Sequence, residues 1–436
     1  MPDRGAAPPD RIRLGQLPAE MRGPLREIAG LAAERGERAY LVGGVVRDLL
    51  LERPVHDLDL VVEGDGPALA RAFARRRQGE LREHPRFGTA SVTIRQDRPP
   101  LRIDLATARK ERYAHPGALP ETGPAALERD LARRDFSINA MAVPLHGSGA
   151  WRVVDPFDGR GALAARRIRA LHPASYRDDA TRIFRAVRFA ARLRFQPAAA
   201  DRRRIRDALA AGALDPISGA RVRTELEKIY GDRHPARAVA GLERLGALAA
   251  LLPDHRYIPP AHRPQRRLER LGPALASWKL SLTAAGIGLL ALGWKRAGRA
   301  AFGRRAGLRA EQREAAATAL ERSSRLLRYL EGESASRAGS LHARCRAESD
   351  MTVLLALLRA DTRIAATRAQ RYLETLRHAR PAVRGSDLIR AGVPAGPWIA
   401  RALAAGLRAR LDGRAPDDAA EAAHALAVAR RLARRT

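Results

Sequence analysis

The stretch from Tyr40 to Val62 constrains the fold of this chain more than any other, and it reads YLVGGVVRDLLLERPVHDLDLVV. Its first three residues form an apolar run that predicts a buried strand, and Gly43 and Gly44 follow as a turn. Apolar residues then recur with helical spacing from Val45 to Leu51, before a second strand that we expect to open with Asp57. This order of strand, glycine turn, helix and strand predicts a small head that combines a sheet with helices.

Two carboxylates lie close together on that second strand. Successive side chains of a strand point to opposite faces, so Asp57 and Asp59 are expected to project from the same one. Their repulsion is relieved most easily by a metal ion between them, and oxygen ligands favour Mg²⁺ bound together with substrate phosphate. We therefore predict Asp57 and Asp59 as catalytic metal ligands for Mg²⁺, with a solvated strand edge as the alternative interpretation.

The glycine pair provides a place for that phosphate. Without Cβ atoms, Gly43 and Gly44 let the backbone approach a triphosphate, and the start of the next helix presents free N–H groups. Arg47, one turn into the helix, adds a fork of charged donors. A simple turn that binds no ligand is the alternative interpretation of the glycine pair.

The order and spacing of these features resemble the head of the DNA polymerase β-like nucleotidyltransferases. Within them, the stretch is similar to the class II tRNA nucleotidyltransferases (CCA-adding enzymes) and bacterial poly(A) polymerases, which carry LVGGxVRDLLL…DxDxVV. The resemblance implies an α+β fold, with a small polymerase β-like head of mixed sheet and helices before a long all-α neck, body and tail. It also implies transfer of a nucleotide to an RNA end with the help of Mg²⁺.

A third carboxylate is a candidate for the same site. The segments Thr89–Arg95 and Leu101–Ala106 alternate apolar and polar residues around a turn at 97–100, which predicts a hairpin. In the second segment the apolar residues share one face, which leaves Asp104 on the other. The polymerase β-like architecture implies such a catalytic residue beside Asp57 and Asp59, although an acid on a solvated edge fits the pattern nearly as well.

The segment RRDFSINAMAV, from Arg133 to Val143, sets polar residues among apolar ones. It resembles the family motif RRDFTINAMA, which contacts the incoming nucleotide. The resemblance implies that Arg134 neutralises phosphate, and that Asp135 and Asn139 support the sugar or the metal site. A structural hydrogen-bond network is the alternative.

The preceding stretch, Arg109 to Leu127, is too long and too rich in Pro and Gly for a simple connection, so we expect it to be functional or mobile.

The stretch from His172 to Phe195 is expected to form one helix, because its apolar residues recur with helical spacing; these are Ile183, Val187, Ala190 and Leu193. Asp178, Asp179 and Arg182 then fall within one turn of it. An ordinary surface ion pair, worth roughly 0.3–0.5 kcal/mol, would explain them on an arbitrary helix.

An Asp and an Arg can also select a nucleobase. A carboxylate only accepts hydrogen bonds and a guanidinium only donates, so together they match the amine and ring nitrogen of cytosine or adenine. Guanine and uracil present the reverse pattern and leave both groups unpaired. In the family, EDxxR acts in this way as an amino-acid template. Here the motif is DDATR, so Asp179 and Arg182 match, Asp178 replaces Glu, and Arg185 follows one turn later.

The rest of the chain is expected to be helical. Turn-rich and Pro-rich joints suggest four parts: a loose leader at 1–20, a nucleotidyltransferase head at 21–158, a neck with the base-selecting helix at 159–255, and an RNA-binding body and tail at 256–436. Arginine clusters in the last part fit contacts to an RNA backbone, and a solvated charged face is the alternative.

Charge and cysteine content limit the class of protein. The 436 residues include 80 Lys and Arg against 48 Asp and Glu, a net charge of +32, which favours a polyanionic partner. Cys345 is the single cysteine, so an intrachain disulfide is excluded. The N-terminus has no secretory apolar segment, and the apolar run Leu280–Trp294 suits a buried helix better than a membrane span. We therefore expect a cytoplasmic protein without membrane contact.

These observations lead to one main functional hypothesis. The chain is expected to add C, A or both to the 3′ end of tRNA from CTP and ATP, gripping the acceptor arm by shape and charge, with no DNA partner. A poly(A) polymerase, or an enzyme that adds only A or only CC, remains open. An RNA-binding protein with an inactive head and a small-molecule nucleotidyltransferase are alternatives from other classes. The sequence leaves the oligomeric state undetermined.

Overall fold

The computed structural model describes residues 8–85, 88–95, 100–112 and 121–434. The chain divides into two compact units. Unit 1 comprises Met1–Ile217 and Gly241–Ala250, and unit 2 comprises Ser218–Ala240 and Leu251–Thr436. Unit 1 holds the sheet with its covering helices, and unit 2 is helical in its described part. The α+β architecture expected from the sequence is therefore confirmed.

A six-stranded mixed sheet forms the centre of unit 1. Its strands run in the order β3 (Glu80–His84), β4 (Thr89–Ile94), β5 (Leu101–Thr107), β2 (Leu58–Glu63), β1 (Arg38–Val42) and β8 (Ala142–Pro144). β2 and β5 are parallel, and the other neighbouring pairs are antiparallel. The predicted hairpin of β4 and β5 is confirmed, and its turn residues 96–99 lie outside the described part of the chain.

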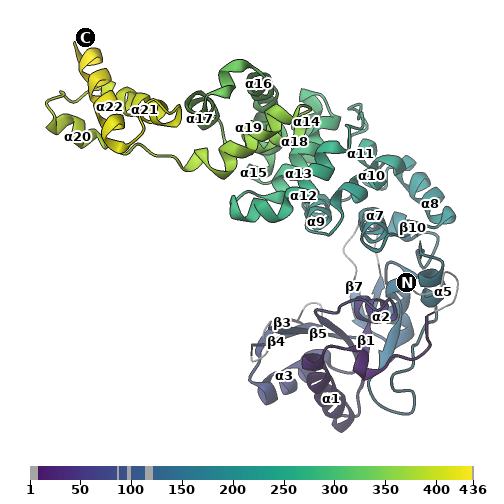
Figure 1. Cartoon of the computed structure of the whole chain (residues 1–436). Coiled ribbons are helices and arrows are strands. Elements are labelled where there is room, and N and C mark those ends of the chain that lie inside the picture. The colour runs from purple at the N-terminus through teal and green to yellow at the C-terminus, as the bar shows by residue number, and fades with distance from the viewer. Residues whose placement is uncertain (1–7, 86–87, 96–99, 113–120, 435–436) are drawn as a thin grey trace. The chain divides into compact units, whose positions relative to one another are not determined.

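Several helices belong to unit 1 together with this sheet. They are α1 (Ala19–Glu34), α2 (Gly44–Leu50), α3 (Gly66–Arg77), α4 (Leu127–Ala132), α5 (Gly159–Ala164), α6 (Ser175–Asp178), α7 (Thr181–Leu193), α8 (Ala199–Ala210) and α11 (Ala247–Ala250). α1 and α3 pack against each other, and α3 packs on β4 and β5 (Figure 1). Two further strand pairs are short: β6 (Arg109–Arg112) with β7 (Glu121–Pro124), and β9 (Arg167–Ile168) with β10 (Gln196–Pro197).

The described part of the leader is not loose, contrary to our expectation. Ile12 and Leu17 are each only 1% exposed. The amide of Ile12 donates to the carbonyl of Trp151 at 2.9 Å, and the amide of Val153 donates to the carbonyl of Asp10 at 2.8 Å. Apolar burial and backbone pairing therefore fasten this segment to the head, a long-range pairing that the local sequence does not reveal.

Unit 2 is built from short helices. Its helices are α9 (Gly219–Tyr230), α12 (Arg263–Ser277), α13 (Leu282–Leu290), α14 (Arg296–Arg305), α15 (Ala310–Glu314), α16 (Leu320–Glu331), α17 (Ala338–Arg346), α18 (Asp350–Arg359), α19 (Arg363–Glu374), α20 (Gly385–Arg390), α21 (Trp398–Leu411) and α22 (Asp418–Ala433), while α10 (Pro235–Leu245) belongs to both units. The apolar run at 280–294 forms the buried helix α13, as predicted. In the described residues, every helix is too short or too polar to span a bilayer.

Candidate active site

A cavity of about 690 Å³ opens on the sheet of unit 1. Its walls come from the end of β1, the start of α2, strands β2, β4 and β5, the segment 133–139 and helix α7. Eight arginines and four aspartates line it, a surplus of four positive charges. A cavity of this size and charge suits a nucleoside triphosphate.

Two of the predicted catalytic carboxylates stand side by side at this cavity. Asp59 on β2 is in direct register with Asp104 on β5, and both line the cavity wall. Asp57 is exposed and precedes β2, which begins at Leu58. We expected Asp57 to belong to this strand, and that prediction is wrong. Arg102 donates from Nε to Asp104 Oδ1 at 3.0 Å.

The environment of Asp59 fits a bound cation. The Asp59 side chain is exposed at the cavity, but the protein atoms around it, and then the neighbouring charges of Asp104 and Asp57, raise the pKa of its carboxyl, with Arg134 opposing them. A cation between the carboxylates would remove this repulsion. Within the described residues no three acidic, His or Cys side chains are grouped to hold a metal ion. Such an ion would therefore take further ligands from substrate phosphate and water, as Mg²⁺ commonly does.

The glycine turn between β1 and α2 is tight. Gly43 has φ +68° and ψ −123°, a backbone conformation that favours glycine, and its amide donates to the carbonyl of Met141 at 3.1 Å. A Cβ there would lie 2.7 Å from Nη1 of Arg134. A larger residue at this position would therefore displace the arginine that we predicted to neutralise phosphate.

Arg47 lies in the cavity wall but is 3% exposed, and its donors are engaged within the protein. Nε and Nη2 donate to the two carboxylate oxygens of Asp48 at 2.9 and 2.7 Å, and Nη1 donates to Oδ1 of Asn139 at 2.7 Å. The Nε and Nη2 donors of Arg47, which we expected to bind phosphate, thus bind Asp48 instead, and its Nη1 holds Asn139 in place.

Asp130 anchors the two arginines that begin the second motif. It is fully buried and accepts from Arg133 at 2.6 Å and from Arg134 at 2.9 Å. Burial alone would raise the pKa of the Asp130 carboxyl, but the two guanidinium groups outweigh it and hold the pKa below its ordinary value. Asp130 consequently fixes both arginines in the cavity wall.

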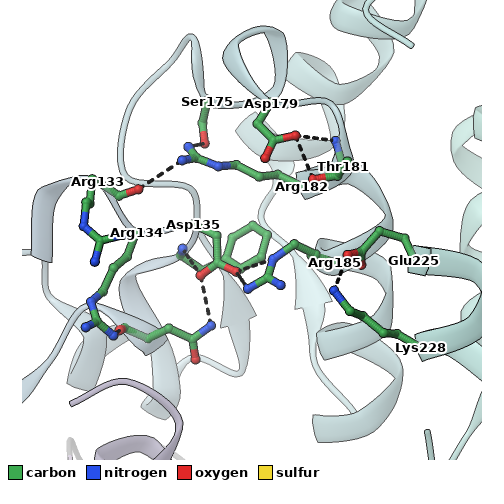
Figure 2. Close-up of polar contacts among 12 residues, drawn as sticks. Arg133, Arg134, Asp135, Ser175, Asp179, Thr181, Arg182, Arg185, Glu225 and Lys228 are labelled. Atoms are coloured by element: carbon green, nitrogen blue, oxygen red, sulfur yellow. Dashed lines mark hydrogen bonds and ion pairs between the residues drawn. The ribbon is translucent and has the colours of Figure 1, made fainter. Parts of the chain in front are cut away.

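Asp135 joins the second motif to helix α7 (Figure 2). Its Oδ1 accepts from Asn139 Nδ2 at 3.0 Å, and its Oδ2 accepts from Arg185 Nε at 2.8 Å. Burial opposes ionisation, but Arg185 and Asn139 lower the pKa of this carboxyl overall. Asp135 therefore remains charged and fixes the direction in which Arg185 points.

The base-selecting segment is not one helix, contrary to the prediction. α6 ends at Asp178 and α7 begins at Thr181, with Asp179 in an extended conformation (φ −140°, ψ 98°) between them. The side chain of Asp179 accepts from the amide of Thr181 at 3.0 Å, and this bond competes with continued helix. The predicted buried stripe of α7 is confirmed, with Ile183 at 0% and Val187 at 3% exposed.

The break separates the two aspartates of the motif. Asp179, Arg182 and Arg185 line the cavity, whereas Asp178 does not. Asp178 Oδ2 lies 3.8 Å from Nδ1 of His172. Burial, and then Arg182, lower the pKa of His172, so this contact is not an ion pair at neutral pH. The geometry favours Asp179 over Asp178 as a carboxylate that reads a base.

Several residues of the site were not singled out from the sequence. Some of them line the cavity: His84, Ser91, Arg102, Arg133, Phe189 and Arg192. Asp130, Ser175 and Thr181 lie outside the cavity wall and hydrogen-bond to residues that line it. The spacing of Asp130 from Arg133 and Arg134, three and four residues, was a usable signal for an anchor in a helical turn. His84 and Ser91 come close to the predicted residues only through tertiary folding.

Comparisons with known proteins agree with this geometry. Residues 39–169 match the poly A polymerase head domain, and residues 203–258 match a family described as the probable RNA and SrmB-binding site of polymerase A. The A-adding tRNA nucleotidyltransferase of Geobacter sulfurreducens is 38% identical over 238 residues, which cover 55% of this chain and 27% of that protein. The CC-adding tRNA nucleotidyltransferase of Deinococcus radiodurans is 38% identical over 238 residues, covering 55% and 61%.

These matched regions span less than two thirds of the curated relatives. The structural similarity extends further along the chain. The Thermotoga maritima CCA-adding enzyme complexed with tRNA_CCA gives a TM-score of 0.75 at 27% identity, covering 94% of this chain and 96% of that one. The likeness therefore includes the helical part as well as the head.

Proposed function

We propose that this member of the poly(A) polymerase and tRNA nucleotidyltransferase family adds C, A or both to the 3′ end of tRNA. It would use CTP and ATP, release pyrophosphate and need no nucleic-acid template. One observation carries the proposal: a single positively charged cavity holds the Asp59 and Asp104 pair as well as Asp179 and Arg182. The first pair suits phosphoryl transfer, and the second suits recognition of a base.

Asp59 and Asp104 would hold the divalent ion that nucleotidyltransferases of this family generally use, and Asp57, which lies outside the cavity wall, would join them only after a change of position. The raised pKa of Asp59, due to the protein atoms around it and to the nearby carboxylates, supports a cation at this position. When bound, Mg²⁺ would supply Lewis acidity that eases deprotonation of the attacking 3′-hydroxyl and stabilises charge on the transferred phosphate. For Asp104 to contribute, Arg102 would have to release it.

The arginines of the second motif would hold the triphosphate. Arg134 lies against Gly43, close to the turn where the backbone can approach phosphate, and Asp130 fixes its direction. Arg185, fixed by Asp135, lies in the same cavity wall. Charge-assisted donors that are already oriented bind phosphate with little loss of side-chain freedom.

Asp179 and Arg182 would select the base. The carboxylate would accept the exocyclic amine of cytosine or adenine while the guanidinium donates to the neighbouring ring nitrogen. GTP and UTP would leave both groups unpaired, and this mismatch is the physical source of discrimination. Relatives of the A-adding and of the CC-adding kind are both found at 38% identity to this chain over 238 residues, so the proposal keeps both nucleotides.

The proposed partner is the acceptor arm of tRNA. The net charge of +32 and the likeness to a CCA-adding enzyme complexed with tRNA_CCA support it. Recognition through duplex shape and phosphate charge needs no base sequence. The expected cytoplasmic location stays a prediction.

The decisive experiment offers the purified protein three tRNA substrates, ending at the discriminator base, at C and at CC. Each of the four nucleoside triphosphates is supplied separately, and then CTP and ATP together. Addition of C and then A indicates a complete CCA-adding enzyme, and addition of A only to the CC end indicates an A-adding one. No incorporation of either nucleotide on any substrate would refute the proposal.

A poly(A) polymerase is the second candidate. The match of residues 39–169 to a poly A polymerase head domain favours keeping it, because that head does not distinguish the two activities. In the same assay, extended with RNAs other than tRNA, long A tails would identify the polymerase.

A further inference from the structure

Arg182 is held by partners from two separate segments of the chain. Its Nη1 donates to the hydroxyl of Ser175 at 2.6 Å, and its Nη2 donates to the carbonyl of Arg133 at 3.0 Å (Figure 2). Its Nη1 also lies 3.4 Å from Nε2 of His172. Arg182 is 5% exposed and Ser175 is fully buried. Because both terminal nitrogens are engaged, the guanidinium cannot turn without leaving buried donors unpaired.

Asp179 is held by a residue that follows it in the sequence, Thr181. Its Oδ1 accepts two hydrogen bonds from Thr181, one from the amide at 3.0 Å and one from the hydroxyl at 2.7 Å (Figure 2). Thr181 is 6% exposed and opens helix α7. With one carboxylate oxygen fixed by two donors, rotation of the carboxylate about its terminal bond is restricted.

Restricted rotation matters for choosing a base. Guanine and uracil also offer one acceptor and one donor, but in exchanged positions. A guanidinium and a carboxylate that could turn would adapt to the exchanged pattern and accept the wrong nucleotide. A pair that is held in one orientation leaves its groups unpaired instead, and this penalty is what discriminates.

We propose that Ser175 and Thr181 are positioning residues for nucleotide selection. The inference rests on the proposed function and goes beyond it, because it gives specificity to two side chains that need not touch the nucleotide. Ser175 sets the orientation of Arg182, and Thr181 sets that of Asp179. The accuracy of nucleotide selection then depends on the hydroxyl groups of Ser175 and Thr181, which hold Arg182 and Asp179.

The test measures kcat/KM for CTP, ATP, UTP and GTP with Ser175→Ala and Thr181→Val. Each change removes a hydroxyl with little change in volume. We expect preference for CTP or ATP over UTP or GTP to fall about tenfold in each variant, with the Kd for tRNA unchanged. Thr181→Ser keeps the hydroxyl and should retain the wild-type preference to within about twofold.

Thr224→Val is the matched control. Thr224 is exposed on α9 in unit 2, and its hydroxyl donates to the carbonyl of Ala220 at 2.8 Å, so the same substitution there should leave preference unchanged. Thermal melting of every variant shows whether it is folded, and Thr181→Val decides the matter if Ser175→Ala unfolds.

The two proposals fail in different ways. Incorporation of C or A by the wild-type protein establishes the reaction independently of the variants. Unchanged preference in a folded, active Thr181→Val, or an equal loss of rate with all four nucleotides, would overturn the positioning role alone. Loss of preference in Thr181→Ser would also overturn it, because the hydroxyl is then not the cause.

Discussion

A single aromatic side chain lies among three of the cavity arginines. The ring centroid of Phe189 lies 5.1 Å from Cζ of Arg188, 5.4 Å from that of Arg47 and 5.7 Å from that of Arg185. The ring meets Phe136 edge to face at 5.9 Å, which fixes its plane. An aromatic face attracts cations, so Phe189 offsets part of the repulsion among the guanidinium groups and keeps them at the cavity wall.

Replacing this ring should therefore weaken substrate binding. We expect Phe189→Leu to raise the KM for CTP and ATP by roughly tenfold, because the three arginines lose a shared cation–π partner worth about 0.5–2 kcal/mol per contact. Phe195→Leu is the control, since Phe195 is also 6% exposed and follows the same helix. Steady-state kinetics on both variants checks the prediction, and equal KM values in the two would contradict it.

Asp201 gives a second prediction at the residue scale, one that depends on pH. It is fully buried, and its Oδ1 accepts from the amide of Ala170 and the hydroxyl of Tyr176, each at 3.0 Å. Its Oδ2 has no hydrogen-bond partner among the described residues. Burial raises the pKa of this carboxyl above its ordinary value, despite the two hydrogen bonds that lower it.

The sign of the effect follows from proton linkage. A raised pKa means that the folded state binds the proton more tightly, so the free energy of unfolding falls as pH rises from the unfolded to the folded pKa. Asp201→Asn stays neutral and keeps an oxygen acceptor. We expect its melting temperature to exceed that of the wild type at about pH 7.5, with a difference that shrinks towards about pH 4.5. A difference that grew on acidification would contradict the raised pKa.

At the scale of elements, the parallel register of β2 and β5 determines the acidic part of the site. The register places Asp59 beside Asp104, and it also places Arg102 on the face that both carboxylates share. Arg102 is 57% exposed, so its ion pair with Asp104 is weak, but it still competes with a cation for the same oxygen.

Direct measurement of Mn²⁺ binding tests this arrangement without relying on activity. We expect Asp59→Asn to weaken binding more than tenfold, because it removes a charged ligand, and Arg102→Ala to strengthen it about two- to fivefold. Arg82→Ala is the control: Arg82 pairs with Ser91, which pairs with Asp104, so it carries the same charge two strands away. An equal gain from both arginine variants would show that only the general charge matters.

Elements with local signals were predictable from the sequence, and their interruptions were not. The apolar runs and glycines gave β1, α2 and the hairpin of β4 and β5, because these depend on nearby residues. The break between α6 and α7 was not predicted because the apolar spacing continues through it. The hydrogen bond from the Thr181 amide to the Asp179 side chain interrupts the helix at this point. A short polar contact of this kind leaves no periodic signal.

The partners of the site residues escaped for a different reason. Arg47 contacts Asn139, 92 residues away, and Arg185 contacts Asp135, 50 residues away. Motifs predicted which residues belong to the site but not which of their donors remain for a substrate, because tertiary packing decides that. Arg47 illustrates the difference, since its donors are engaged by Asp48 and Asn139.

At the scale of the whole molecule, charge and shape act over different distances. The net charge of +32 creates a field that attracts a polyanion from solution, and salt screens it within a Debye length of about 8–10 Å. In the proposed function, Asp179 and Arg182 would select the base through direct hydrogen bonds, and Arg182 is 5% exposed. Salt should therefore separate binding of tRNA from choice of nucleotide.

The full chain offers that test without substitution. Between about 50 and about 200 mM salt we expect the Kd for tRNA to rise by roughly 10³-fold, because neutralised phosphates release their counterions on binding. Over the same range the ratio of kcat/KM for CTP or ATP to that for UTP or GTP should change less than about twofold, since buried short-range contacts are screened little. Measuring both quantities on one preparation avoids differences in active fraction. A preference that fell in parallel with tRNA affinity would mean that bound RNA, rather than Asp179 and Arg182, selects the nucleotide.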